Sequence, residues 1–187
     1  MPAPYAVYDL PRMTEEEYLE FEAESETKHE YFDGHVTGMA GASDPHELVA
    51  MNLAAALHAH LRGKGCRVYK SDMKLRLNVA AKKTYYYPDV MVVCDPKDNH
   101  RIYKERPKLI IEIMSENWKR DFIEKYHAYQ NIASLEEYVL VSSDAEAPEV
   151  TIMRRAESWD QGRSQIAGAF ELVSVGLKLT VEELYLV

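Results

Sequence analysis

The stretch that decides the fold is Leu109-Ile110-Ile111-Glu112-Ile113-Met114, an apolar run that carries a single charge. A run of this kind predicts a β-strand that is covered on both faces. Strand alternation places Glu112 on the face that it shares with Ile110 and Met114. A carboxylate inside a covered sheet is costly unless it is protonated or paired with a positive charge. Glu112 therefore indicates either a metal-binding acid or one half of an ion pair with lysine or arginine.

A second acid opens another apolar strand. Residues 87–93 read Tyr-Pro-Asp-Val-Met-Val-Val, so Asp89 stands at the head of an apolar run. Pro88 removes a ladder donor, and we therefore expect the strand to begin or bulge there. A bulge beside a carboxylate can aim that side chain into a site. A Pro-Asp pair alone usually marks a turn, but Asp89 and Glu112 together can converge on one hard cation.

A helix predicted over residues 118–132 carries a basic group toward these acids. Four aromatic side chains share one face of this helix at helical spacing: Trp118, Phe122, Tyr126 and Tyr129. Lys125 lies at the rim of that face, from which a long amine can reach a site at the edge of the sheet. The alternative is a surface ion pair, because Asp121 and Lys125 are four residues apart.

The first third of the chain supplies two helices and a hairpin. Residues 14–17, Thr-Glu-Glu-Glu, form a capping box that starts a helix ending near Ala23. The pair Asp33-Gly34 stands between two alternating runs and predicts a tight hairpin. A second helix is expected with Asp44 as its cap and Gly63 at its end.

Further strands are expected over residues 67–77, 86–94 and 137–142, and nearer an edge over 150–154 and 172–179. Residues 181–186 indicate a closing helical turn. The order of elements predicts an α/β or α+β fold, a mixed sheet with helices packed on it. The length suits a single domain over residues 1–187, with residues 1–12 as an extended arm.

Composition excludes several classes of protein. Hydrophobic residues make up 47% and charged residues 28%, as in ordinary globular proteins. No apolar run approaches a membrane helix and no secretory signal opens the chain, so we expect a cytoplasmic protein with no membrane partner. The net charge of −9 argues against nonspecific coating of nucleic acid, although metal-binding acids would also lower it. Cys66 and Cys94 are expected to be small core residues in a reducing compartment.

An ordered set of segments carries a family resemblance. The segments are MTEEEYLEF (13–21), HEYFDGHV (29–36), PHELVAMNL (45–53), YYYPDVMVV (85–93), LIIEIMS (109–115), RDFIEKYHAY (120–129) and EYVLV (137–141). In this order and spacing the sequence resembles the Uma-two family of restriction endonucleases, a branch of the PD-(D/E)XK nuclease superfamily. The resemblance implies a restriction-endonuclease-like mixed sheet flanked by helices, preceded by an N-terminal helix and a β-hairpin.

The resemblance also assigns the two acids and a lysine. It makes Asp89 the aspartate of the PD motif and Glu112 the second acid. The lysine that the superfamily usually places two residues after that acid is replaced here by Met114. The family has moved the lysine to the following helix, where Lys125 matches the pattern D-x-x-x-K-x-x-x-Y. The chain departs from the family at residues 115–117, which read Ser-Glu-Asn where Ser-Pro-Ser is usual.

Three further residues and a cofactor follow from the resemblance. Glu30 is a candidate third catalytic acid, and His46 and Tyr129 are expected to line the cleft. Mg²⁺ or Mn²⁺ would be held by Asp89, Glu112 and the backbone carbonyl of Ile113, since hard cations prefer oxygen ligands. The implied activity is metal-assisted hydrolysis of phosphodiester bonds in nucleic acid, with DNA as the expected substrate.

In this mechanism Lys125 orients the attacking water or stabilises the transition state, and Glu30 completes the metal coordination directly or through water. Cutting two strands favours a twofold assembly, so a homodimer is expected. Two other classes stay open. One is a catalytically silent domain that dimerises or binds a protein partner, which the acidic balance favours. The other is a metal-dependent hydrolase of a different phosphate ester.

Overall fold

The computed structural model describes residues 10–114, 119–160 and 164–187, apart from the side chains of residues 119–122. Within these residues the largest sheet has six strands, in the order β11 (Ser164–Gln165), β10 (Val150–Arg154), β9 (Glu137–Ser142), β8 (Leu109–Met114), β6 (Val90–Val93) and β3 (Arg67–Lys70). A five-stranded sheet has the order β2 (His35–Gly38), β1 (His29–Phe32), β5 (Lys82–Tyr86), β4 (Lys74–Val79) and β7 (Tyr103–Lys104). A separate hairpin pairs β12 (Ala169–Leu172) with β13 (Leu177–Thr180).

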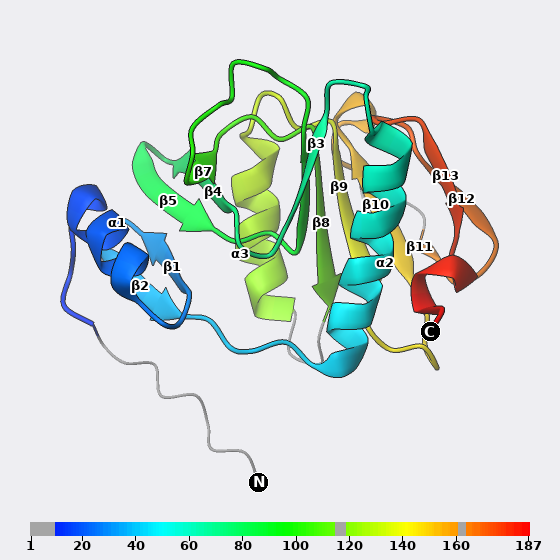
Figure 1. Cartoon of the computed structure of the whole chain (residues 1–187), viewed down its shortest axis with the longest axis horizontal. Coiled ribbons are helices and arrows are strands. Elements are labelled where there is room, and N and C mark those ends of the chain that lie inside the picture. The colour runs from blue at the N-terminus through cyan, green and yellow to red at the C-terminus, as the bar shows by residue number, and fades with distance from the viewer. Residues whose placement is uncertain (1–9, 115–118, 161–163) are drawn as a thin grey trace, which may run out of the picture.

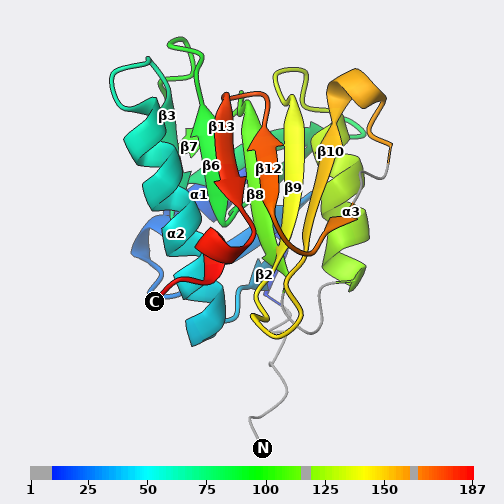
Figure 2. The ribbon, with the colours of Figure 1, turned by 90° about the vertical axis from the view of Figure 1, so that its right-hand side faces the viewer.

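Three α-helices of the described chain, α1 (Glu15–Glu24), α2 (Asp44–Leu61) and α3 (Lys119–Gln130), surround these sheets. Short 3-10 turns follow at η1 (Arg155–Glu157) and η2 (Glu182–Tyr185). One face of the six-stranded sheet is covered by α2 and the β12–β13 hairpin, and its other face by α3 and the five-stranded sheet (Figures 1 and 2). Both faces of the sheet are therefore buried, which explains the unbroken apolar runs of β6 and β8.

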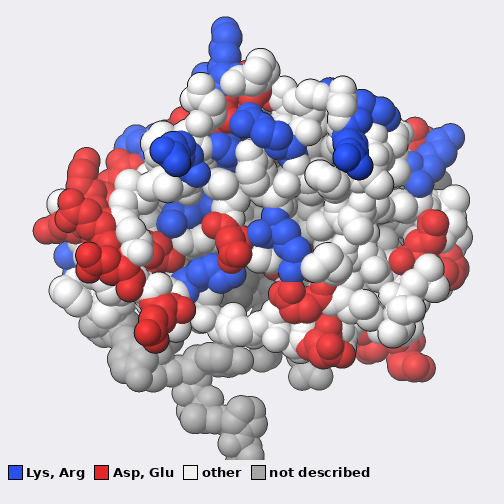
Figure 3. Space-filling model, viewed as in Figure 1, with Lys and Arg blue, Asp and Glu red and all other residues white. Residues whose placement is uncertain are grey.

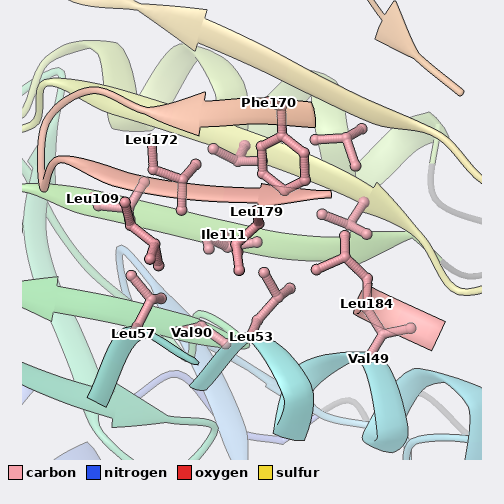
Figure 4. Packing of buried hydrophobic residues seen from close by; sticks show 14 of the residues in the cluster. Val49, Leu53, Leu57, Val90, Leu109, Ile111, Phe170, Leu172, Leu179 and Leu184 are labelled. Atoms are coloured by element: carbon pink, nitrogen blue, oxygen red, sulfur yellow. The ribbon is translucent and has the colours of Figure 1, made fainter. Parts of the chain in front are cut away.

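The first core cluster forms where α2 meets the sheet. Its side chains at positions i, i+4 and i+8 of the helix, Val49, Leu53 and Leu57, are almost fully buried. They point at Val90 and Ile111, while the hairpin closes the cluster from the far side (Figure 4). The second cluster fills the space between the two large sheets and receives Ile110, Leu140, Leu75, Leu77, Tyr86 and Tyr129.

Strands β8 and β9 are the only parallel pair of the described six-stranded sheet, and α3 makes the crossover between them. A parallel pair needs such a crossover, because the chain must return to the starting edge. The arrangement places Glu112 of β8 beneath the helix that carries Lys125. The fold thus brings together two of the residues singled out in the sequence.

The N-terminal helix α1 packs against the β1–β2 hairpin, which forms one edge of the five-stranded sheet, and a smaller core cluster lies between them. The capping box is present, with Thr14 and Glu17 bonding each other's main-chain N–H groups. Tyr18 is fully buried and donates a hydrogen bond to the carbonyl of His29. The hairpin turns at Asp33 (φ 48°) and Gly34 (φ 93°), the positive φ angles that a tight turn of this kind requires.

Most predicted elements are confirmed, including the mixed α+β class, the hairpin, the closing turn and the strands over 109–114, 137–142 and 150–154. The strand predicted over 67–77 is wrong, because it is interrupted at Ser71 (φ 50°), where the chain passes from β3 of the six-stranded sheet to β4 of the five-stranded sheet. The strand predicted over 172–179 is also wrong, since a turn with Gly176 (φ 64°) separates β12 from β13. Of the strand predicted over 86–94, only Val90–Val93 form β6, and Tyr86 instead ends β5; the break falls at Pro88, which lacks a ladder donor.

Two further expectations need correction. Ser43 rather than Asp44 occupies the N-cap of α2, and its side chain makes no capping hydrogen bond. Cys66 and Cys94 are not unpaired core residues but form a disulfide. They meet because Arg67 pairs with Val93 across β3 and β6, which sets the two cysteines opposite each other at the end of the ladder. None of the described helices is long and apolar enough to span a membrane.

Candidate active site

Asp89 stands directly before β6, where the main chain enters the six-stranded sheet. One carboxylate oxygen, Oδ2, accepts a hydrogen bond from the N–H of Ile113 at 2.8 Å. The same oxygen lies 3.1 Å from Nε2 of His46, in the first turn of α2. Two neighbours thus fix the orientation of the Asp89 carboxylate.

Glu112 projects from β8 into the second core cluster. Its oxygen Oε1 accepts a hydrogen bond from the Tyr129 hydroxyl at 2.7 Å, and Oε2 accepts one from the N–H of Asp89 at 3.3 Å. Burial raises the pKa of Glu112 to about 7; Lys125 opposes this rise, and the charge of Asp89 adds to it. Burial and the charge of Asp89 thus favour the protonated Glu112 carboxyl, and the Lys125 ammonium favours the ionised one.

Lys125 lies between these acids and the N-terminal hairpin. Its Nζ is 2.9 Å from Oε1 of Glu30 and 3.8 Å from Oε1 of Glu112. The ammonium also lies 5.4 Å from the centre of the Tyr86 ring, a cation–π distance. Burial acts to lower the pKa of Lys125, but the charges of Glu112 and Glu30 outweigh it and hold that pKa above its ordinary value. Lys125 is therefore a buried, charged ammonium.

His46 brings the start of α2 to the site. Its hydrogen bond with Asp89 raises the pKa of the imidazole, while burial acts in the opposite direction. The second ring nitrogen, Nδ1, is buried and has no hydrogen-bond partner in the described part of the chain. The hydrogen bond with Asp89 thus acts to stabilise the protonated imidazole, and burial acts against it.

The carbonyl of Ile113 faces the same place as the Asp89 carboxylate. The N–H of Ser143 donates to the carbonyl of Met114, so the main-chain polar groups of Met114 point toward β9. Those of the preceding residue, Ile113, then point to the other side of β8, toward β6. The N–H and C=O of one strand residue point to the same side. Continuing the β6–β8 register, in which Val90 pairs with Ile111, would set Pro88 opposite Ile113. Proline has no N–H, so no ladder donor covers that carbonyl.

The structure gathers all seven residues predicted for the site: Glu30, His46, Asp89, Glu112, Ile113, Lys125 and Tyr129. However, the described side chains contain no group of three or more His, Cys, Asp or Glu residues that could hold one metal ion. The two described acids in direct contact here are Asp89 and Glu112, and Glu30 is joined to Glu112 through Lys125. The alternative pairing of Lys125 with Asp121 involves a side chain outside the described residues.

Sequence reasoning missed Tyr86, whose ring forms a wall beside the lysine. It also missed a buried network in which Glu22 accepts hydrogen bonds from His29 and from the Tyr87 hydroxyl, two positions before Asp89. The spacing of Tyr18 and Glu22, four residues apart on one face of α1, could have indicated that this face is buried. This network ties the N-terminal unit to the segment that carries Asp89.

The surface around these elements is mixed in charge. Basic side chains, separated by uncharged residues and with few acidic ones among them, lie over the centre of the face drawn in Figure 3. Acidic side chains gather over α1, whose first turn carries Glu15, Glu16 and Glu17. That face has no continuous basic surface of the kind that binds nucleic acid nonspecifically.

Comparison with known proteins identifies the family. A family model described as "Putative restriction endonuclease" matches residues 15–182. The chain belongs to the Uma2 family. The resemblance carried by the seven sequence segments is confirmed by this match.

Two relatives of the Uma2 chain come from Synechocystis sp. (strain PCC 6803), and both are named as uncharacterized proteins. The protein slr1290 is 32% identical over 178 residues, which cover 94% of this chain and 93% of the relative. The protein sll1609 is 35% identical over 133 residues, which cover 69% of this chain and 74% of the relative.

A solved structure shares the fold. It is titled a "putative nuclease belonging to DUF820" from Anabaena variabilis, with a TM-score of 0.69 and 15% sequence identity. The likeness covers 92% of this chain and 97% of the other. It confirms the nuclease-like α+β fold predicted for the Uma2 chain.

Proposed function

We propose that this chain is a metal-dependent endonuclease that hydrolyses phosphodiester bonds of nucleic acid, with DNA as the expected substrate. One observation carries the proposal. The main-chain N–H of Asp89 donates a 3.3 Å hydrogen bond to Oε2 of Glu112, which sets the two acids side by side, and the Lys125 ammonium lies 3.8 Å from Glu112. Paired carboxylates beside a fixed ammonium suit a reaction in which negative charge develops on a phosphate.

The donor set fits Mg²⁺ or Mn²⁺. The ligands would be Asp89, Glu112 and the carbonyl of Ile113, all hard oxygen donors of the kind that these cations prefer. The raised pKa of Glu112 supports this assignment, because a cation would relieve the burial of its charge beside that of Asp89. When bound, the ion supplies a water of lowered pKa and neutralises charge on the phosphate.

The chain's own residues hold this arrangement in place. His46 and the N–H of Ile113 occupy one oxygen of Asp89, which leaves the other oxygen of that carboxylate for a ligand. The Tyr129 hydroxyl fixes the rotation of Glu112 in the same way. Lys125 offers its ammonium to the negative charge of the reacting phosphate. Such second-layer contacts set the geometry on which metal affinity and rate depend.

The family description and the nuclease title of the Anabaena structure support nucleic acid as the substrate class. We also propose a homodimer, because one site per subunit would let a twofold assembly cut both strands. The proposed compartment is the cytoplasm. Light scattering after size exclusion tests the dimer: a mass near the 21.5 kDa of one chain at micromolar concentration would contradict it.

The activity is tested by incubation with plasmid, single-stranded DNA and RNA, in Mg²⁺, in Mn²⁺ and with chelator. We expect cleavage that needs metal and that Asp89→Ala and Glu112→Ala abolish. Glu26→Gln is a matched control, because Glu26 is exposed and lies outside the site. Metal should also raise the melting temperature of the wild type and the control but not of Asp89→Ala. Metal-independent cleavage, or cleavage that both alanine variants retain, would refute the proposal.

A catalytically silent binding domain is the second candidate. The observation in its favour is the absence, among the described side chains, of three grouped metal ligands. The ion pairs of Lys125 with Glu30 and Glu112 also balance part of the acidic charge without a metal. A melting temperature that does not respond to Mg²⁺ or Mn²⁺, together with intact nucleic acid in every assay, would establish this alternative.

A further inference from the structure

Glu30 has an unusual set of contacts for a residue expected to bind metal. Its oxygen Oε1 is buried, and its partner is the Lys125 ammonium at 2.9 Å. No other described group donates a hydrogen bond to that oxygen. The ammonium is closer to Glu30 than to Glu112, from which it lies 3.8 Å away. The geometry thus joins Glu30 to the lysine.

The same geometry separates Glu30 from the acid pair. The sequence of contacts runs from Glu30 to the Lys125 ammonium at 2.9 Å, and from that ammonium to Glu112 at 3.8 Å. The described side chains also contain no group of three or more His, Cys, Asp or Glu residues that could hold one metal ion. Lys125, which contacts both Glu30 and Glu112, therefore stands between Glu30 and the proposed metal ligands.

We propose that Glu30 is a positioning residue, which holds the Lys125 ammonium against Glu112 and acts on cleavage through this lysine and not as a metal ligand. The inference rests on the proposed nuclease function. A lysine side chain has about 2 kcal/mol of rotamer entropy to lose before its amine is fixed in one place. An ion pair on the far side of the ammonium restricts those rotamers before the substrate arrives, and such pre-organisation is what a charge-stabilising group needs.

The hairpin supplies Glu30 from a different sheet than the one that carries Glu112. Tyr31 of β1 pairs with Tyr85 of β5, so Glu30 lies beside Tyr86, whose ring also contacts the ammonium. Lys125 therefore bridges the five-stranded and the six-stranded sheet. The N-terminal hairpin is thus part of the active site.

A double-mutant cycle tests the proposal, with Glu30→Ala, Lys125→Met and the double variant. If Glu30 acts through the lysine, each single change lowers kcat by about a hundredfold, the scale for misplacing one group. The double variant should then be no worse than Lys125→Met alone, because the position of an absent ammonium no longer matters. Glu30→Gln should recover part of the rate, since an amide oxygen still accepts a hydrogen bond from the ammonium. KM should stay within about twofold throughout.

Two measurements test the inference without relying on catalytic turnover. Titration calorimetry with Mn²⁺ should give the same affinity for the wild type, Glu30→Ala and the exposed control Glu26→Gln. Acylation of lysines, followed by peptide mass spectrometry, should modify Lys125 faster in Glu30→Ala than in the wild type. Lys178, whose side chain is 74% exposed, should react equally in both and serves as the reference.

The outcomes separate the two proposals. If the rate losses multiply in the double variant, Glu30 acts independently of Lys125. If the Mn²⁺ affinity falls tenfold or more in Glu30→Ala, Glu30 is a metal ligand. Either result would overturn this inference alone. Unchanged acylation of Lys125 in Glu30→Ala would overturn it as well. A wild-type protein that neither binds Mn²⁺ nor cleaves nucleic acid would instead overturn the nuclease function, and this role with it.

Discussion

Replacing Glu112 by glutamine should change how the stability of the metal-free protein depends on pH. The pKa of this carboxyl rises from an ordinary 4.5 to about 7 in the folded chain, chiefly because it is buried. Between these pH values the folded state binds more protons than the unfolded state, so stability falls as the pH rises. The stability that the protonated Glu112 carboxyl contributes is complete below about pH 4.5 and is lost as the pH passes through 7. Glutamine cannot titrate, and Glu112→Gln therefore lacks this loss.

The magnitude follows from the two pKa values. At about 1.36 kcal/mol for each pH unit, the difference between 4.5 and 7 amounts to about 3 kcal/mol. Only 13% of the Glu112 side chain is exposed, so solvent screening reduces this figure little. For a chain of 187 residues the same figure corresponds to about 6–12 °C in melting temperature.

The assay is urea denaturation with chelator at several pH values between 4.5 and 8.5. Relative to the wild type, Glu112→Gln should gain about 3 kcal/mol between the two ends of this range. Added Mg²⁺ should close the gap at high pH by stabilising the ionised wild type. Glu26→Gln, a change at an exposed position, should follow the wild type at every pH. Parallel curves for Glu112→Gln and the wild type would refute the reasoning, because they would mean that burial does not perturb this carboxyl.

Three further outcomes are expected. Lys125→Met should lower cleavage about a hundredfold while tightening Mn²⁺ binding, since it removes a positive charge 3.8 Å from Glu112; weaker Mn²⁺ binding in calorimetry would contradict this. Replacing both Cys66 and Cys94 by serine should cost about 3–4 kcal/mol of unfolding free energy, as expected for a disulfide spanning 28 residues, and dithiothreitol should bring the wild type to the same value. Glu137→Ala should cost about 3–5 kcal/mol in urea denaturation, because Glu137 is 2% exposed and holds an arginine and two main-chain N–H groups; a loss below 1 kcal/mol would count against a buried ion pair.

The sequence predicted the strands of the centre of the fold better than those of its margins. Strands over 109–114 and 137–142 were placed correctly, because burial on both faces gives them apolar runs with sharp ends. Near the margins, exposed and buried positions mix, and an interruption such as the one at Ser71 goes with a single unusual backbone angle. Hydrophobic patterns carry no information about that angle.

The residues of the candidate site also fall into two groups, those that the local sequence marks and those that it does not. Asp89 and Glu112 could be found from local sequence, since a charge within an apolar strand is an anomaly that needs a partner. Glu30 and His46 came only from the family resemblance, because nothing in their own segments marks them. The contact between Glu30 and Lys125 depends on how two sheets pack, and the pairing of the cysteines depends on the β3–β6 register. The spacing of residues along the chain predicts neither contact.

The crossover from β8 through α3 to β9 has a consequence for how the site assembles during folding. Glu112 and Lys125 belong to this one continuous strand–helix–strand unit, so their contact closes a short loop, at low entropic cost. Asp89, His46 and Glu30 must then dock from progressively more remote segments, and contacts of long range form slowly. The acid and its lysine are therefore expected early in folding, and the complete site only after the N-terminal hairpin has docked. A nascent chain that ends before Glu137 lacks the strand β9 that closes the unit, and it should emerge from the ribosome without a working centre.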